Sequence, residues 1–229
     1  MQFPSPLFAC RLHRRYKRFL ADMAMPDGTT ATVHCPNPGA MTGLADAGLR
    51  CWVAPAAPGA KLRWGWKLVE TATGMALVDP TLANRVVAEA LAAGRVPGLP
   101  SYGAVQPEAR IDTESRIDFR LDTPGGPCWV EVKSVTLARE GWAEFPDSRT
   151  IRGTRHLHAL TAAAQRGEGA AMVYLLARTD CTRIRIAADI DPAYAAAFAT
   201  ARAAGVRMIG LATAITPEVV TATTEVPVA

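Results

Sequence analysis

The sequence lacks long apolar runs and closely spaced cysteine pairs, and each of these absences excludes or disfavours a class of protein. No apolar run reaches the length of about 18 residues that a helix needs to cross a bilayer, so no membrane partner is expected. The five cysteines are far apart and never form a C-x-x-C pair, which argues against a disulfide framework and a structural zinc site. Arginines follow the short apolar patch of residues 1–9, which is the reverse of a signal peptide, so a cytoplasmic protein is expected.

The basic excess of the chain is confined to its first third. Residues 1–70 contain nine Lys and Arg against four Asp and Glu, whereas residues 71–229 contain 16 against 17. A polyanion such as a nucleic acid is the simplest partner for this surface, because its phosphates supply the opposite charge. A solvated basic surface without a partner is the alternative.

Short strand patterns separated by Gly and Pro turns fill the first 80 residues. The runs that favour strands are 13–20, 29–34, 50–54, 61–71 and 75–79. Their number and length predict an oligonucleotide-binding (OB)-like β-barrel over residues 1–80.

Basic and aromatic side chains of this barrel are candidates for contacting a strand, since such barrels bind phosphates with cations and bases with aromatic rings. The alternative is that the tryptophans are ordinary core residues. The candidates are Arg14, Arg15, Lys17, Arg18, Trp64 and Trp66.

Residues 81–229 change to a pattern of alternating helices and strands. Helical spacing over 81–93 is followed by strand runs at 102–109, 116–122 and 128–137, and then by helices at 148–166 and 192–204 that alternate with strands at 170–177 and 206–213. The order αβββαβαβ predicts an α/β (α+β) domain, a mixed sheet covered by helices. This order is the core of the restriction-endonuclease-like architecture, among other folds.

Two neighbouring strands of this domain carry the candidate catalytic residues. Alternation along 116–122 is expected to place Ile117, Phe119 and Leu121 on one face and Asp118 on the other. In the next strand Glu131 and Lys133 share a face.

Two carboxylates so close repel one another unless a cation lies between them or one is protonated. Mg²⁺ (or Mn²⁺) held by Asp118, Glu131 and the backbone carbonyl of Val132 would remove this repulsion. Lys133 would then orient the attacking water or stabilise the charge on a phosphoryl group. The alternative is an ordinary ion pair between strands.

Glu89, in an otherwise apolar helical stretch, is either a further carboxylate at the metal or a surface residue.

The helix expected at 148–166 carries basic residues near its start. Asp147 or Ser148 is expected to cap it, and Arg149, Arg152 and His156 form a stripe suited to phosphate. A solvated amphipathic face is the alternative.

Several long motifs resemble the sugar fermentation stimulation protein A (SfsA) family, in order and at similar spacing along nearly the whole chain. They are RYKRFLAD (15–22), HCPNPGAMTGL (34–44), SRIDFRL (115–121), EVKSVTL (131–137), FPDSRTIRGTRHL (145–157) and DPAY (191–194). The resemblance implies an N-terminal OB-like barrel joined to a PD-(D/E)XK nuclease-like domain over residues 81–229. It also implies that Asp118 is the acid of that superfamily, that Glu131 and Lys133 are its E-x-K, and that Glu89 or Glu108 is an extra carboxylate.

For function, the resemblance implies DNA binding and a regulatory effect on sugar use, particularly that of maltose. The residues predict a metal-dependent phosphodiesterase acting on DNA, on a single strand, or on RNA. A DNA-binding regulator that keeps the nuclease-like fold without turnover is the main alternative, and an enzyme of carbohydrate metabolism is a weaker one. No pattern in the sequence indicates an oligomeric state.

Overall fold

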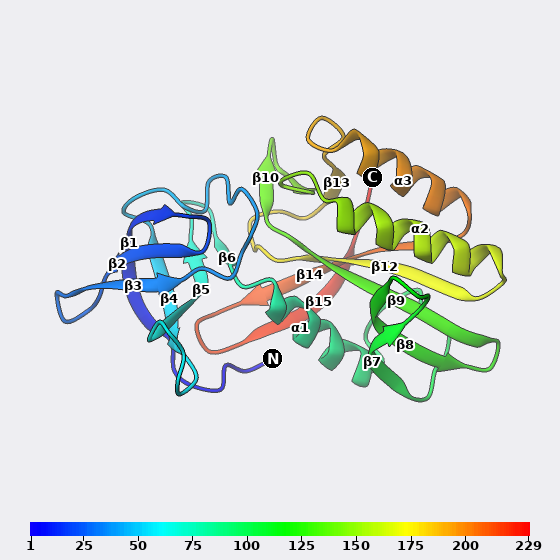
Figure 1. Cartoon of the computed structure of the whole chain (residues 1–229), viewed down its shortest axis with the longest axis horizontal. Helices are drawn as coiled ribbons and strands as arrows, with labels where there is room; N and C mark the ends of the chain where they lie inside the picture. Colours follow the sequence, from blue (N-terminus) through cyan, green and yellow to red (C-terminus); the bar gives the residue numbers. More distant parts are fainter.

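The computed structural model describes all residues 1–229, which form a small barrel beside a larger domain of sheet and helices. In Figure 1 the barrel lies on the left and the larger domain on the right. None of the three helices has the length and the apolar run that a bilayer crossing requires.

The barrel is closed by five strands in the order expected of an OB-like fold. Its sheet runs β3-β2-β1-β4-β5, and β5 returns to β3 through a parallel contact at Gly65 and His34. β6 adds to β5 outside this ring. The strands are β1 (Phe8–Tyr16), β2 (Leu20–Ala24), β3 (Thr30–His34), β4 (Arg50–Pro55), β5 (Trp64–Glu70) and β6 (Met75–Leu77). The predicted barrel is therefore confirmed.

One strand expected in this part is in fact a hairpin. The run 13–20 covers the end of β1, a turn and the start of β2, with Tyr16 paired to Leu20. Lys17 and Arg18 form the turn with φ of 46° and 63°. Left-handed backbone at a tight turn matches the twist of the flanking strands, but neither residue is one of the Gly or Asn residues by which such turns are usually recognised.

The larger domain has a six-stranded mixed sheet in the order β15-β14-β12-β9-β8-β7. Its central strands β9, β12 and β14 are parallel, and the outer pairs are antiparallel. The elements are α1 (Thr81–Ala92), β7 (Val105–Arg110), β8 (Arg116–Thr123), β9 (Gly126–Val135), β10 (Leu137–Arg139), β11 (Trp142–Phe145), α2 (Ile151–Gln165), β12 (Gly169–Leu176), β13 (Ile184–Ile186), α3 (Pro192–Ala203), β14 (Arg207–Ile215) and β15 (Val220–Val226).

The predicted αβββαβαβ order is confirmed, and it is supplemented by four strands that the sequence pattern did not reveal. Three of them, β10, β11 and β13, have only three or four residues and form a separate small sheet. Such short runs have too few alternating positions to be recognised. The fourth, β15, extends the main sheet beyond β14.

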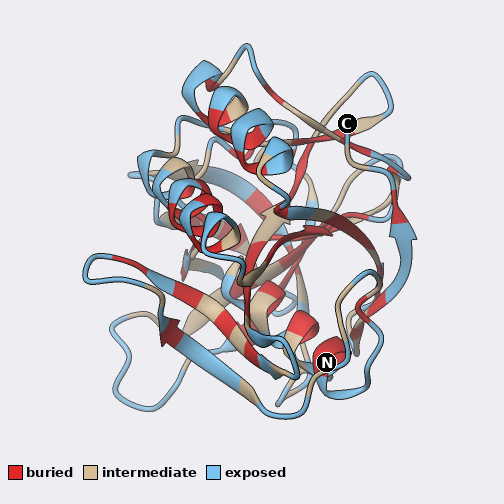
Figure 2. Cartoon of the chain, turned by 90° about the vertical axis from the view of Figure 1, so that its right-hand side faces the viewer, coloured by how far each residue is buried: buried red, intermediate tan, exposed pale blue.

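The helices cover the two faces of the main sheet. α1 packs with Phe119, Val130 and Val132 on one face, while α2 and α3 pack with Trp129 and Tyr174 on the other. Figure 2 shows the buried side of each helix turned to the sheet and the exposed side turned outward. Strand β9 is thus buried on both faces, and the residues at its carboxyl end are held rigidly.

The start of α2 differs from the sequence prediction. Thr150 caps the helix, and its side chain accepts a hydrogen bond from the Gly153 backbone N–H at 3.1 Å, so the capping role expected of Asp147 or Ser148 is wrong. Asp147 instead contacts the barrel, where its Oδ2 accepts a hydrogen bond from the Met41 backbone N–H at 3.3 Å.

We expect Gly39→Ala to destabilise the junction between barrel and domain. A Cβ at position 39 would lie 2.1 Å from Asp147 Oδ2, so one side must move, and the free energy of unfolding should fall by about 1 to 3 kcal/mol. Urea unfolding measures this change. Gly103→Ala, where a Cβ meets nothing within 4 Å, is the matched control. Adding Asp147→Ala should recover most of the loss, and additive losses in the double variant would contradict the proposed clash.

Candidate active site

The hairpin of β8 and β9 brings Asp118 opposite Glu131 at a point where the regular ladder stops. Phe119 pairs with Val130, and the pairing is regular from there to the turn. Beyond it, Asp118 Oδ2 accepts a hydrogen bond from the Val132 backbone N–H at 2.8 Å, and Glu131 Oε2 accepts one from the Asp118 backbone N–H at 3.3 Å. At this point, side-chain carboxylates therefore accept the hydrogen bonds that backbone carbonyls accept in a regular β-ladder.

This interruption corrects the face assignment made from alternation. Ile117 packs in the core under α2 and α3, whereas Phe119 and Leu121 pack in the core under α1. The strand thus changes face at Asp118, which strict alternation does not anticipate.

Two cationic or protonatable groups surround Glu131, which is 2% exposed. Lys133 Nζ lies 2.5 Å from Glu131 Oε1, and His156 Nδ1 contacts the same oxygen. Burial alone would raise the pKa of Glu131, but the charge of Lys133 and the hydrogen bond and charge of His156 outweigh it and lower that pKa to about 2. Glu131 is therefore ionised at neutral pH.

Asp118 has weaker compensation. Asn84, on α1, donates a hydrogen bond from Nδ2 to Asp118 Oδ1 at 2.7 Å. Burial and the neighbouring charge of Glu131 raise the pKa of Asp118 to about 6, against the opposing effects of the Val132 N–H, Lys133 and Asn84. Of the two acids, Asp118 is the one whose negative charge lacks a full partner.

The donor set fits a hard divalent cation that keeps several waters. No group of three or more His, Cys, Asp and Glu side chains in the chain is arranged as a metal site. Two carboxylates, with a backbone carbonyl and waters, are nevertheless a usual Mg²⁺ environment, and ionised oxygens are its preferred ligands. A cation here would supply the positive charge that Asp118 lacks.

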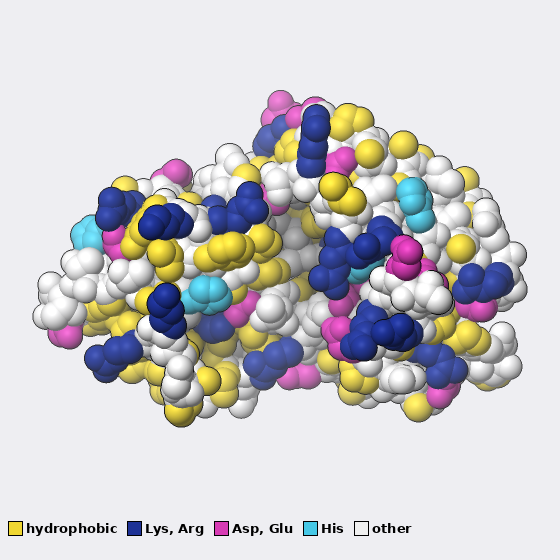
Figure 3. All heavy atoms as spheres, in the orientation of Figure 1, with side chains coloured by type: hydrophobic (Ala, Val, Ile, Leu, Met, Phe, Trp, Pro, Cys, Tyr) yellow, Lys and Arg dark blue, Asp and Glu magenta, His cyan; other side chains and the backbone are white.

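A cleft of about 600 Å³ between the barrel and the larger domain opens on this cluster. Asn84, Val132 and Lys133 line it, so Asp118 and Glu131, which they contact, lie directly behind its wall. Figure 3 shows the surface hollowed between the two parts of the molecule. Arg18 from the barrel and Arg149 from the segment before α2 also line the cleft.

His156 is not part of a solvated stripe, which corrects its expected role as a phosphate contact. It is 3% exposed and faces Glu131 and Lys133, at 3.5 Å from the Lys133 Nζ. Arg152 lies on the solvent side of the imidazole, and its Nε donates to His156 Nε2 at 3.3 Å. Arg152 is exposed on α2, but Arg149 precedes the helix and lines the cleft, so the expected stripe is wrong, and His156 belongs to the acidic cluster.

The two glutamates expected as further metal ligands form no hydrogen bond or ion pair with the cluster. Glu89 pairs with the N-terminal ammonium of Met1 at 2.6 Å. It is five residues from Asn84 on α1, which places it about 140° around the helix from the face that meets Asp118. Glu108 is exposed, with a φ of 51° that interrupts the edge strand β7. The assignment of Glu89 is therefore wrong, whereas Glu108 lies across from Asp118 in the β7–β8 register without a hydrogen bond to it.

In the barrel, Trp66 and Arg15 have structural roles. Trp66 is fully buried, and its indole N–H donates to the Leu68 carbonyl at 2.9 Å, so its role as a stacking platform is wrong. Arg15 donates hydrogen bonds to the carbonyls of Asn37 at 2.8 Å and Gly39 at 3.0 Å, which holds the loop that borders the cleft.

The other barrel candidates keep surface positions. Arg14 and Lys17 are exposed, and Arg14 pairs with Asp22 at 3.0 Å. Trp64 is partly buried at the rim of the barrel core and packs edge-on against Phe8, with ring centroids 5.1 Å apart.

Comparison with known proteins identifies the family. The profile described as "Sugar fermentation stimulation protein RE domain" matches residues 81–219, and the one described as "SfsA N-terminal OB domain" matches residues 14–78. The chain belongs to the SfsA family. The predicted resemblance is therefore confirmed.

Relatives and a solved structure agree with this assignment. A protein of Jannaschia sp. (strain CCS1), named "Sugar fermentation stimulation protein homolog", is 52% identical over 100% of this chain and 97% of its own length. A protein of the same name from Ruegeria sp. (strain TM1040) is 51% identical over 95% of this chain and 96% of its own. The solved structure of Pyrococcus furiosus SfsA in complex with Ca²⁺ superposes with a TM-score of 0.90 at 26% identity, covering 100% of this chain and 98% of that one.

The SfsA chain has one site residue that sequence reasoning missed. Asn84 stands among buried residues of α1, between Ala83 and the exposed Arg85. The only sequence signal for Asn84 is a polar amide beside the apolar face of a short helix. This signal is weak, because an asparagine in a helix is more often exposed to solvent than bound to a carboxylate.

We expect Asp118→Asn to stabilise the metal-free SfsA chain at pH 8. The folded pKa of Asp118 is about 6 and its ordinary value 3.8, so wild-type stability falls as pH rises through this interval, and the neutral amide avoids a loss of about 1 to 3 kcal/mol. Urea unfolding from pH 4 to 8 measures the difference, which should vanish near pH 4.

The same variant separates cation binding from fold stability. Mg²⁺ or Mn²⁺ should stabilise the wild type at pH 8 and leave Asp118→Asn unchanged. Asp122→Asn, an exposed carboxylate on the same strand, is the matched control and should respond to the ion as the wild type does. Equal stabilisation of Asp118→Asn by the ion would contradict the assignment.

Proposed function

We propose that this SfsA protein binds nucleic acid and hydrolyses phosphodiester bonds with a divalent cation. The observation that carries the proposal is that Lys133 lines a cleft, with Asp118 and Glu131 directly behind it, and that a basic part of the barrel lines the same cleft. Carboxylates beside an ammonium on a rigid strand pair suit a phosphoryl group, on which negative charge develops during the reaction.

Lys133 is the group best placed to meet a phosphate. Its side chain lines the cleft, and its Nζ is held by Glu131 Oε1 at 2.5 Å. His156 contacts the same carboxylate from the side of α2 and fixes its orientation. The ammonium would stabilise charge on the phosphoryl oxygens, while Glu131 keeps it in position.

A divalent cation, Mg²⁺ or Mn²⁺, completes the proposed chemistry. When bound at Asp118 and Glu131, with the Val132 carbonyl as a further oxygen, it would supply positive charge at the phosphoryl group and lower the pKa of an attacking water. The raised pKa of Asp118 supports this assignment. The Ca²⁺ complex of the Pyrococcus furiosus protein supports a divalent ion in the family.

The barrel supplies the surface for the strand. Arg18 lines the same cleft as Lys133, and Arg14 and Lys17 are exposed on the β1–β2 hairpin that carries it. Backbone phosphates following these residues would reach the cluster through the cleft. We propose DNA as the partner, with single-stranded DNA and RNA as the other substrates to compare.

A DNA-binding regulator without turnover is the second candidate. The observation that favours it is that all four oxygens of Asp118 and Glu131 already accept hydrogen bonds or ion pairs from the protein. The proposed link to sugar use rests on the names of the relatives. A cytoplasmic location is proposed on the five unpaired, buried thiols.

We expect Lys133→Ala to lower the rate of cleavage by about 100-fold or more and to leave strand affinity almost unchanged. The measurement is cleavage of labelled single-stranded, duplex and branched DNA and of RNA, with Mg²⁺ or Mn²⁺ and with EDTA. Lys133→Arg keeps the charge and should also lose turnover, because a planar fork cannot replace a compact ammonium in this space. Binding without cleavage in the wild type would favour the regulator.

A further inference from the structure

A second pocket, of about 290 Å³, borders the acidic cluster and is separate from the cleft between the domains. No hydrophobic residue lines it, and His156 joins it to Glu131. Four of its lining residues are arginines: Arg110, Arg116, Arg152 and Arg155. Two come from the β7–β8 hairpin and two from α2.

None of these four arginines forms an ion pair, whereas seven other arginines of the chain do. The carboxylates of the pocket are Asp112 and Glu114. Asp112 Oδ1 is used by its own loop, where it accepts hydrogen bonds from the backbone N–H groups of Glu114 at 2.8 Å and Ser115 at 2.6 Å. Apart from the Arg152 Nε, which donates to His156, the guanidinium groups have no ion pair that would keep them from an external anion.

Strand pairing in the β7–β8 hairpin brings two of these positive charges close together, which is unfavourable when no ligand is bound. Arg110 and Arg116 are directly opposite in the β7–β8 ladder, and like charges at such positions destabilise a sheet. Arg152 and Arg155 are three residues apart on α2, so they share a face of the helix. An anion between the hairpin and the helix would remove the repulsion.

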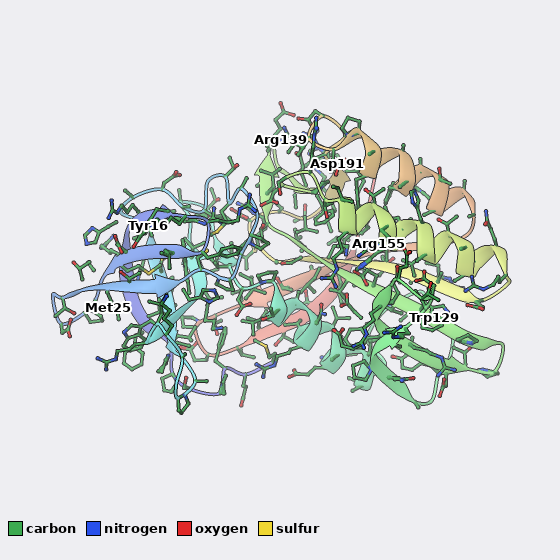
Figure 4. All side chains as sticks on the ribbon, viewed as in Figure 1. Tyr16, Met25, Trp129, Arg139, Arg155 and Asp191 are labelled. Atoms are coloured by element: carbon green, nitrogen blue, oxygen red, sulfur yellow. The ribbon has the colours of Figure 1, made fainter.

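The pictures agree with this arrangement. Figure 3 shows dark blue side chains on two sides of a small acidic patch on the larger domain. In Figure 4, Arg155 lies on α2 above strand β9, which carries Trp129.

We propose that this arginine pocket binds the terminal phosphomonoester of a nucleic-acid strand whose adjoining phosphodiester lies at Lys133. The choice of a nucleic-acid strand as the ligand rests on the proposed function. A monoester carries up to two negative charges and three terminal oxygens, whereas an internal phosphodiester carries one charge and two free oxygens. Four forked guanidinium groups around one small pocket suit the monoester better. The protein would then recognise the end of a strand.

The test compares short single strands that bear a 5′-phosphate, a 3′-phosphate or only hydroxyl ends, with an internal fluorophore. All arms use the full-length protein in EDTA, so that no metal-dependent cleavage occurs, and fluorescence anisotropy gives the affinity. One phosphorylated end should bind about tenfold more tightly than the hydroxyl ends, the effect of a charge-assisted contact. Adding Arg110→Gln and Arg116→Gln should remove this preference.

The matched control carries Arg95→Gln and Arg202→Gln, which remove the same charge from exposed sites outside the pocket, and it should keep the preference. The Arg110→Gln and Arg116→Gln protein should unfold at the same urea concentration as its parent or a higher one, because a repulsive pair is gone. Absence of strand binding, equal affinity for all ends, or a preference that survives in this variant would overturn the proposal. If the wild-type protein cleaves strands but shows no preference for a phosphorylated end, only the assignment of the pocket is overturned. If it shows the end preference but does not cleave, only the proposed nuclease activity is overturned.

Discussion

The repulsion between the buried carboxylate of Glu131 and the half-buried carboxylate of Asp118 is the constraint on which the rest of the site depends. Asp118 and Glu131 face each other where β8 and β9 cease to pair regularly, and their charges would be costly without compensation. Glu131 is paired with Lys133 and His156, whereas Asp118 accepts hydrogen bonds only from the neutral Asn84 amide and Val132 backbone N–H and is affected by Lys133 without contacting it. The unequal compensation divides the pair into a permanently ionised acid and one that gains from a cation.

Four separate elements must meet for this arrangement to exist. β9 is fixed between β8 and β12, α2 brings His156 over Glu131, and α1 brings Asn84 from the opposite face of the sheet. The barrel closes the other side, where Gly39 permits the approach of Asp147. Because the sheet is covered on both faces, the cluster reaches solvent through the cleft and through the arginine pocket beside His156. The architecture therefore determines from which directions a ligand can approach.

The sequence predicted those parts of the site that are local in the chain. Asp118, Glu131 and Lys133 lie in one hairpin, so alternation and turn signals suffice to bring them together. The contact of His156 with Glu131 depends on how α2 docks on the sheet, and the helical pattern alone does not contain that information. Trp64 and Trp66 illustrate the same limit, because alternation puts both on the inner face and only barrel closure decides that Trp66 is interior and Trp64 lies at the rim. Glu89 fails for a geometric reason, since its position around α1 is opposite to that of Asn84.

Within three residues, strand β8 takes part in one pair of positive charges and one pair of negative charges. Arg116 faces Arg110 on one neighbouring strand, and Asp118 faces Glu131 on the other. Each contact reduces the stability of the free protein, and each is relieved by a different ligand, the first by an anion and the second by a cation. A phosphate group accompanied by a divalent ion provides both charges, so a strand and its ion would bind cooperatively if each lowers the repulsion that opposes binding of the other. With such coupling, β8 and its neighbours β7 and β9 would be most stable when a strand and its ion are both bound.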